Sequence, residues 1–381
     1  MSLCAVASGA ETWADIITWA DTNEDWIAQH VDMTEGVPSY STIRRLFTLI
    51  KPSKFQALLH GVVECHHPNK KEDHIAIDGK TLRGNRCDNK NIKAMQIVSA
   101  LSIENKFSLA EVRTHKKSNE IKAIPILLGM LELEGVTVSV DAIGANKTVI
   151  EAILNRGAHY VIGLKKNQPS IFEKVVHYAA NEGCAIENII SDGFDDGHGR
   201  TVRRQYFAFP LPEEIRKQGL PEMNTCIAVE RIVQERKGGP VTRHKSYYIT
   251  DHPASHPKLA DYVRQHWEIE SHHWLLDVHF NDDGDKKYEK NSAENFSQIK
   301  RLILNLIKAK EWPGRKKSVK SKVKLVGWDK DLLLDGHLYF LLPHSLPVTI
   351  GVSFGAFNQS NRCTKNVHEN PVSKIAVQKR S

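Results

Sequence analysis

Cysteine is scarce in this sequence, and its spacing argues against two kinds of site. Six cysteines are scattered over 381 residues without a C-x-x-C pair, so a disulfide framework and a zinc ribbon are not expected. Long apolar runs are also lacking, since none approaches the roughly 18 residues that cross a bilayer. The N-terminus has no basic start and soon reaches acidic residues, unlike a signal peptide. We therefore expect reduced thiols, no membrane span and a cytoplasmic location.

Glycine motifs that bind phosphates are missing as well. The sequence has neither a G-x-G-x-x-G loop nor a P-loop, so we expect no nucleotide cofactor. Hydrophobic residues make up 41% and charged residues 25%, which excludes a disordered chain. At about 100–200 residues per domain, the length predicts two to three folding units.

Positive charge is concentrated in one segment. The net charge is +7, and residues 301–330 carry ten Lys or Arg against two acids. A local basic segment favours a polyanion as partner, although charge runs are more often solvated helix faces.

The periodicity of the apolar residues changes along the chain and divides it into regions. Helical spacing dominates up to about residue 65. The next elements run strand, strand, strand, helix, strand, helix, strand, an order typical of a mixed sheet with helices packed on it. Segments of period 2 then predict an inserted antiparallel β-subdomain, with a loop rich in Gly and Asp at Asp192–Arg200. The predicted regions are a helical N-terminal domain (1–68), the first part of an α/β domain (69–165), the β-rich insertion (166–255), the helical remainder of the α/β domain with the basic segment (256–336) and a tail of unknown structure (337–381).

Two acids end separate buried strands of the predicted sheet. A short apolar strand starts at His74 and ends in Asp78, and the strand Val136–Val140 is followed by Asp141. Open sheets bind ligands at this edge, and the two carboxylates converge if the strands are neighbours. Like charges that close repel unless one is protonated or a cation lies between them.

A third acid is expected from the helix that follows the insertion. Helical geometry puts Glu270 on one face with Trp267 and Trp274. We predict that this is the packed face and that both tryptophans belong to the core, with stacking on bases as the alternative. Glu268 lies beside Arg264, with which it pairs in solvent in this interpretation, so Glu270 is the carboxylate that needs a cation.

These three acids together predict a metal site. Mg²⁺, or Mn²⁺ in its place, prefers oxygen ligands, whereas Zn²⁺ prefers nitrogen and sulfur. Two such ions roughly 3.5–4 Å apart suit in-line phosphoryl transfer, which uses carboxylates and no nucleophilic side chain. Polar and basic residues just after the two strands are candidates to hold the phosphates of a DNA strand, with solvated loop charges as the alternative: Lys80, Arg83, Lys165, Lys166, Asn167 and Gln168.

Six sequence blocks, in order along the chain, resemble those of a known family. They are IAIDGKTLRG (75–84), KSNEIKAIPILL (117–128), VSVDAIGANK (138–147), HYVIGLKKNQP (159–169), GHGR (197–200) and HWEIESHHWLLDVHFNDD (266–283). The set resembles the H-repeat-associated proteins, which are DDE transposases of bacterial insertion sequences. The resemblance implies an RNase H-like catalytic domain interrupted by a β-rich insertion, and its three metal-binding acids fall on Asp78, Asp141 and Glu270. It also implies a homo-oligomer that acts on double-stranded DNA, both the element ends and the target.

We expect further DNA contacts in and beside these blocks, at Lys117, Asn119, Arg200, Arg264 and His266. The N-terminus looks shortened relative to the family, and the tail from about Tyr339 resembles none of its segments. Three functions therefore stay open: a transposase, a metal-dependent nuclease of the same fold, and an inactive DNA-binding remnant. For the first, we expect a nucleoid-associated protein of the bacterial cytoplasm.

Two other interpretations of single motifs have weaker support. His266, Glu270 and His273 share a helical face, with His279 nearby, but the H-E-x-x-H order of zinc enzymes is absent. Histidines bonded to partners or exposed at the surface are the preferred interpretation. The predicted helix Ser39–Ile50 carries Arg44 and Arg45 and is either a DNA recognition helix or a simple packing helix.

Overall fold

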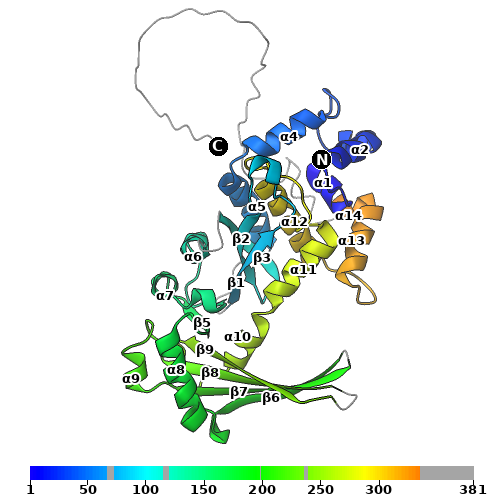
Figure 1. The fold of residues 1–381 in the computed structure, drawn as a ribbon. Coiled ribbons are helices and arrows are strands. Elements are labelled where there is room, and N and C mark those ends of the chain that lie inside the picture. The colour runs from blue at the N-terminus through cyan, green and yellow to red at the C-terminus, as the bar shows by residue number, and fades with distance from the viewer. Residues whose placement is uncertain (67–72, 115–119, 198, 236–238, 335–381) are drawn as a thin grey trace, which may run out of the picture. The chain divides into compact units, whose positions relative to one another are not determined.

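The computed structural model describes residues 1–66, 73–114, 120–197, 199–235 and 239–334 (Figure 1). Among these residues, nine strands form one mixed sheet in the order β3-β2-β1-β4-β5-β9-β8-β7-β6. The strands are β1 (His74–Leu82), β2 (Met95–Ser102), β3 (Phe107–Thr114), β4 (Thr137–Val140), β5 (His159–Leu164), β6 (Ile189–Gly197), β7 (Arg200–Pro210), β8 (Thr225–Glu235) and β9 (Thr242–Thr250).

The centre of the sheet is covered on both faces. The pairs β1–β4 and β4–β5 are parallel, and every other pair is antiparallel. Because helices cover both faces, β4 and most of β1 are buried. Strands in this position are typically rich in apolar residues. Helices α6 (Glu120–Leu128) and α7 (Lys147–Leu154) cover one face, and α10 (Leu259–Gln265) and α11 (Glu268–Phe280) cover the other (Figure 1). The predicted mixed sheet is confirmed.

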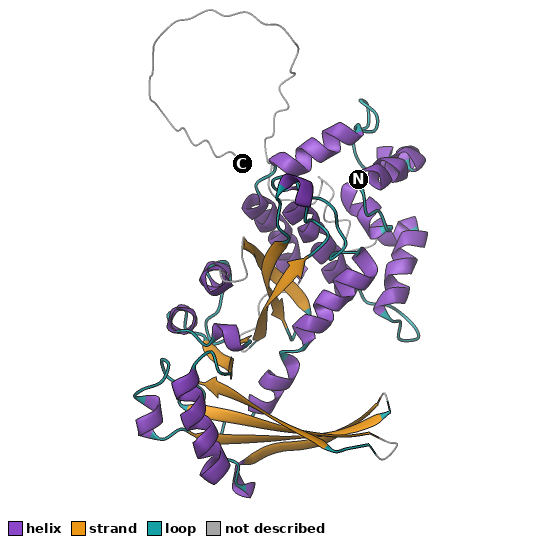
Figure 2. Cartoon of the chain, in the orientation of Figure 1, coloured by secondary structure: helices purple, strands orange, loops and turns teal. Residues whose placement is uncertain are grey.

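The inserted strands continue the central sheet, because β9 pairs antiparallel with β5. The predicted loop at Asp192–Arg200 is wrong, since most of it is the edge strand β6. Glycine weakens a strand, but ion pairs across to β7 compensate here, with Arg203 donating to Asp192 at 2.5 Å. Helix α8 (Pro169–Tyr178) packs near one end of the insertion, whereas no helix of the described residues covers the far ends of the long strands (Figure 2).

Helices from both ends of the described chain share a second core. The N-terminal helices are α1 (Ser2–Ala7), α2 (Trp13–Thr22), α3 (Glu24–Ala28), α4 (Tyr40–Leu49) and α5 (Pro52–His66). They pack with α12 (Ser292–Ala309), α13 (Val319–Trp328) and α14 (Lys330–Leu334). The rings of Trp13, Phe47 and Phe296 contact one another at the centre.

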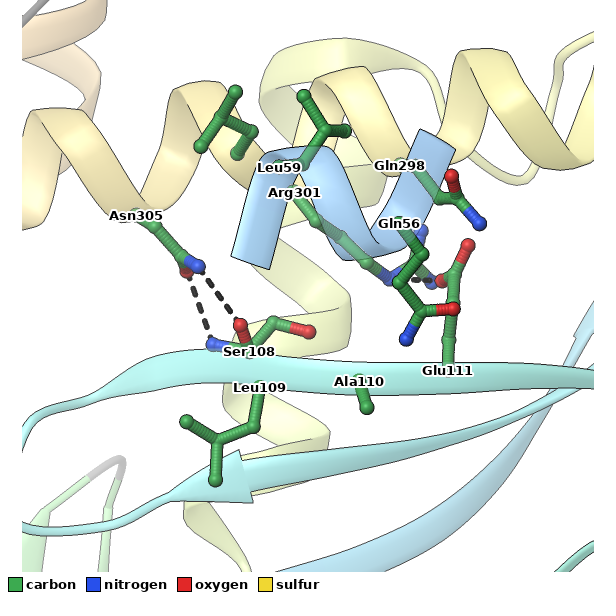
Figure 3. Close-up of a pocket in the computed structure, with 10 residues that line it drawn as sticks. Gln56, Leu59, Ser108, Leu109, Ala110, Glu111, Gln298, Arg301 and Asn305 are labelled. Atoms are coloured by element: carbon green, nitrogen blue, oxygen red, sulfur yellow. Dashed lines mark hydrogen bonds and ion pairs between the residues drawn. The ribbon is translucent and has the colours of Figure 1, made fainter. Parts of the chain in front are cut away.

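Polar contacts dock α12 on β3 (Figure 3). Asn305 donates to the carbonyl of Ser108 at 2.8 Å and accepts from its N–H at 3.0 Å. Arg301 lies 2.7 Å from the Glu111 carboxylate, and burial raises the pKa of Glu111 to about 7 in spite of this cation. The first part of the basic segment is therefore buried, with Arg301 only 4% exposed. Most of the solvent-exposed charges of this segment lie after α12.

Candidate active site

Asp78 and Asp141 lie side by side at one edge of the central sheet. Ile77 of β1 is the register partner of Val140 in the parallel strand β4, and each aspartate follows its strand partner directly. Side chains at equivalent positions of parallel strands point to the same face. For these two residues it is the face covered by α10 and α11, because Ala76 and Ser139, two positions earlier, contact those helices.

Asp78 is oriented by a histidine of α11. Nδ1 of His273 lies 3.5 Å from Oδ2 of Asp78, and Nε2 of the same ring lies 2.9 Å from Oγ of Ser99 on β2. Burial by itself would raise the pKa of Asp78, but the hydrogen bond and charge of His273 outweigh it, so the pKa lies below its usual value. The carboxylate is thus held in its ionised form.

Asp141 is fixed by the loop that it begins. Its carboxylate accepts a hydrogen bond from the N–H of Ile143 at 3.0 Å. Side-chain amides after β5 brace this loop: Asn167 donates to the carbonyl of Ala142 at 2.6 Å, and Gln168 donates to that of Ala145 at 2.8 Å. These two residues, predicted as DNA contacts, therefore hold the backbone that follows Asp141.

Glu270 lies near the two aspartates, but its predicted environment is wrong. The predicted single helix is broken between α10 and α11, at His266 and Trp267. The break changes which side of α11 packs on the sheet, so Ile269, His273 and neighbours are buried while Glu270 is exposed. Burial of its inner part and the charges of Asp78 and Asp141 raise the pKa of Glu270. Glu270 also lines an open pocket together with Gly79, the residue that follows Asp78.

The donor set is suited to a hard divalent cation, because its three acids are all oxygen ligands. Within the described ranges, however, no three His, Cys, Asp or Glu side chains lie close enough to hold one ion. A pair of ions that share the acids needs fewer protein ligands on each, with water and substrate oxygens completing the shell. The charges of Asp78 and Asp141 raise the pKa of Glu270. A bound cation would relieve this repulsion.

The other predicted contacts lie in different environments. Lys80 is buried and paired with Asp277 and Asp282, so its charge is already neutralised. Arg83 lies 3.9 Å from Asp283, with 83% of its side chain exposed. Arg264 pairs with Asp195 at 3.0 Å, and Glu268 lies 3.9 Å from Lys106, so the predicted Arg264–Glu268 pair is wrong.

The remaining candidates are either exposed or outside the description. Lys165, Lys166 and Arg200 are exposed to solvent. Lys117 and Asn119 lie outside the described residues, as does the tail 337–381.

A buried chain of hydrogen bonds lies beside the site, and the sequence analysis did not predict it. Oγ of Ser139 lies 2.7 Å from Nε2 of His74 and 2.8 Å from Nδ1 of His266. Burial lowers the pKa of His266, although the charges of Asp78 and Asp141 act in the opposite direction. The partner-bonded interpretation of His266 and His273 is thus confirmed. Polar residues inside otherwise apolar strands, such as Ser139 and Ser99, were the available signal.

Both tryptophans of α11 are at the surface, so their predicted place in the core is wrong. Trp267 is 56% exposed and Trp274 is 59% exposed. The same break between α10 and α11 explains this error, because the apolar stripe that continues from α10 faces solvent in α11.

The two arginines of α4 are both exposed. Arg44 donates a hydrogen bond to Glu289 at 2.6 Å through Nε.

Comparisons with known proteins identify the family. The family model described as Transposase DDE domain matches residues 69–306, and the model described as DDE_Tnp_1-associated matches residues 1–62. The protein YbfL of Escherichia coli is 33% identical over 320 residues, covering 81% of this chain and 83% of YbfL. The H repeat-associated candidate transposase YhhI of Escherichia coli is 33% identical over 322 residues, again 81% of this chain and 83% of the relative.

The match to this family indicates the fold of the chain and the kind of partner that it binds. The nine-stranded mixed sheet with its flanking helices is an RNase H-like fold with an inserted β-subdomain. The family is one of nucleic-acid-processing enzymes, which implies DNA as partner. None of the helices in the described part of the chain is long and apolar enough to cross a membrane. This chain belongs to the Transposase DDE domain family.

Proposed function

We propose that this chain cleaves DNA at the ends of an insertion sequence and joins the new 3′-OH to a target, with Asp78, Asp141 and Glu270 as the catalytic acids. One observation carries the proposal: Asp78 and Asp141 follow directly paired residues of two neighbouring parallel strands, and Glu270 of α11 lines an open pocket with Gly79, the residue after Asp78. Like charges gathered at one site repel one another unless a cation lies between them. Functional sites are where such arrangements are kept.

The acids are the residues that would hold two Mg²⁺ ions, or Mn²⁺ in their place. Bound there, the metals supply activation of the attacking oxygen and charge stabilisation on the leaving oxygen. The chain itself contributes the geometry. His273 keeps the Asp78 carboxylate ionised and fixed, and Asn167 fixes the loop that carries Asp141.

Exposed cations beside the acids provide phosphate contacts in this proposal. Arg83 follows Asp78 on the same strand extension, and Lys165 and Lys166 follow β5 next to the loop of Asp141. Phosphate contacts position DNA without reading its sequence. We further propose that a homo-oligomer of this chain holds the two element ends together.

The experiment uses purified full-length protein and duplexes that carry the sequences flanking its gene. With Mg²⁺, we expect nicked ends and strand-transfer products joined to plasmid DNA, and EDTA abolishes both. Asp78→Asn, Asp141→Asn and Glu270→Gln each reduce cleavage by at least about 10³-fold, because each removes a carboxylate on which the transition-state charge depends. DNA binding by these variants stays within about threefold.

Glu268→Gln is the matched control, since Glu268 lies two residues from Glu270 on the same helix and pairs with Lys106 at 3.9 Å. It retains near-normal cleavage in this proposal. Inactivity of Glu268→Gln together with an active Glu270→Gln would reverse the assignment. Cleavage without joined products identifies a nuclease, and salt-dependent binding without any cleavage identifies a DNA-binding remnant.

A further inference from the structure

One serine hydroxyl joins the three elements that carry the candidate acids. Oγ of Ser139, on β4, lies 2.7 Å from Nε2 of His74 on β1 and 2.8 Å from Nδ1 of His266, where α10 meets α11. Each of these three residues stands two or four positions before one of the acids in the sequence. The hydroxyl therefore connects the segments that support all three carboxylates.

Both imidazole rings of this hydrogen-bond chain are neutral. His74 and Ser139 are buried, and burial lowers the pKa of His74 to about 3 and also lowers that of His266. A neutral imidazole carries one hydrogen, so one of its nitrogens donates and the other accepts. The serine hydroxyl has a single hydrogen as well. It can donate to one ring only, so the other ring must donate to it.

The environment of His74 selects the direction of the hydrogen-bond chain. Nδ1 of His74 is buried and has no hydrogen-bond partner among the described residues, although Gln265 is near enough to affect the pKa of the ring. Because a buried N–H without an acceptor is rarely tolerated, the hydrogen of His74 belongs on Nε2, from which it is donated to Ser139. The hydroxyl then donates to Nδ1 of His266, and the hydrogen of His266 lies on Nε2.

The charges of the site favour the same direction. Asp78 and Asp141 both act to raise the pKa of His266, against the larger effect of burial. Their carboxylates attract a hydrogen on Nε2 of this ring and would repel a lone pair there. With Nδ1 bonded to Ser139 and a hydrogen on Nε2, the ring has no lone pair to offer a metal ion. The acids are then a set of oxygen ligands alone, which Mg²⁺ prefers and Zn²⁺ does not.

We propose that Ser139 is a positioning residue of the candidate site: its hydroxyl ties the chain break before Glu270 to β4 and keeps the hydrogen of His266 on Nε2, so that this ring does not bind metal. The inference rests on the proposed function, because it takes the three acids as the metal ligands. It adds to that function a reason for the choice of metal. Without the hydroxyl, the ring of His266 can change tautomer and offer a nitrogen to Zn²⁺.

The tautomer can be measured in the full-length protein without DNA. Long-range proton–nitrogen spectra of protein labelled with ¹⁵N-histidine show which nitrogen of a neutral ring carries the hydrogen, and His266→Gln identifies the signals of His266. We expect the hydrogen on Nε2 in the native protein and a mixture of both tautomers in Ser139→Ala. A hydrogen on Nδ1 of His266 in the native protein overturns the inference.

The binding of Zn²⁺ alone gives a second readout, measured by competition with a chromogenic chelator. We expect Ser139→Ala to bind one Zn²⁺ about tenfold more tightly than the native protein does, at the lower end of the effect that residues supporting metal ligands have on affinity. The double variant Ser139→Ala/His266→Gln loses this gain, and Ser139→Thr, which keeps the hydroxyl, retains the native affinity. In Mg²⁺, cleavage by Ser139→Ala falls about tenfold while binding of duplex DNA changes less than about twofold.

Thr137→Val is the matched control, because Oγ1 of Thr137 makes a similar buried contact two residues earlier on the same strand, 3.0 Å from Nε2 of His252. It should leave the tautomer of His266, the affinity for Zn²⁺ and the cleavage rate of the folded protein unchanged. If Ser139→Ala behaves like Thr137→Val in all three measurements, Ser139 is only structural and the inference is overturned, with the acids unaffected. Absence of cleavage by the native protein overturns the proposed function, while the tautomer still decides the role of Ser139.

Discussion

Replacing Asp282 with asparagine tests whether a buried ion-pair network holds the candidate site together. Asp282 is 1% exposed and faces three cations: Lys80 at 3.3 Å, Arg301 at 3.5 Å and Lys300 at 3.7 Å. Lys80 lies two residues after Asp78 on β1 and also pairs with Asp277 on α11. The network therefore joins the strand of one candidate catalytic acid to the helix of another.

The expected loss of stability follows from burial. Asparagine keeps the shape of the side chain but removes the charge that compensates the cations. Removing one partner of a buried pair costs about 3–5 kcal/mol, because the other charge stays in a low-dielectric environment. We expect the free energy of unfolding of Asp282→Asn to fall by that amount. Cleavage falls too, since β1 and α11 lose their shared anchor.

The pH dependence has a definite sign. Burial alone would raise the pKa of Asp282, but Arg301, Lys300 and Lys80 outweigh it and lower the pKa to about 2. A carboxylate with a depressed pKa in the folded state contributes stability that is present above its unfolded value of 3.8 and is lost as the pH falls toward about 2. The difference in stability between the native protein and Asp282→Asn should therefore shrink over that interval.

Urea unfolding followed by circular dichroism measures the effect, with Asp88→Asn as the control. Asp88 also forms an ion pair, with Arg86, but its side chain is 72% exposed, so its loss costs at most about 1 kcal/mol. A loss below about 1 kcal/mol for Asp282→Asn would refute the reasoning, because it would mean that water reaches the three cations.

Two further predictions concern the backbone around the candidate site. Gly84→Ala places a Cβ 2.4 Å from the carbonyl carbon of Gly284, so we expect a loss of more than about 2 kcal/mol in unfolding free energy; Gly193→Ala, with no atom within 4 Å of its Cβ, is the control. Unchanged thermal stability of Gly84→Ala would contradict this contact. Asn167→Asp removes the donor to the carbonyl of Ala142 at 2.6 Å and should lower cleavage by about tenfold or more at unchanged melting temperature. Full activity of that variant would show that the loop after Asp141 needs no brace.

The sequence was sufficient to predict the two aspartates and where their strands begin, but the predicted end of the first strand at Asp78 is wrong, because β1 continues to Leu82 through its pairing with β2. Short apolar runs that end in an acid and a turn are local patterns, and strand burial depends on the same local composition. The mixed sheet was predicted, but the parallel pairing that brings Asp78 beside Asp141 was only a condition of the prediction, and the structure shows that it is met. Glu270 was predicted from its helical face, although the buried environment expected for it was wrong, and the resemblance to a known family pointed to the same three acids.

The orientation of α11 could not be predicted from periodicity. One uninterrupted helix from α10 would have buried Glu270, Trp267 and Trp274 together. The chain breaks at His266, where the ring hydrogen-bonds to Ser139 on β4, and the helix then restarts with a different face toward the sheet. This hydrogen bond joins residues more than a hundred positions apart, so no local window of the sequence contains it.

The sequence by itself thus determined the mixed sheet, the aspartates of two of its strands and the family of this protein. Tertiary structure decided which charges face solvent: Lys80 and Arg301 are buried in ion pairs, whereas Arg83 and the two tryptophans of α11 are exposed. The physical reason is that strand formation depends mainly on neighbours in the chain. The burial of a charge depends on partners that only the folded chain brings within a few ångströms.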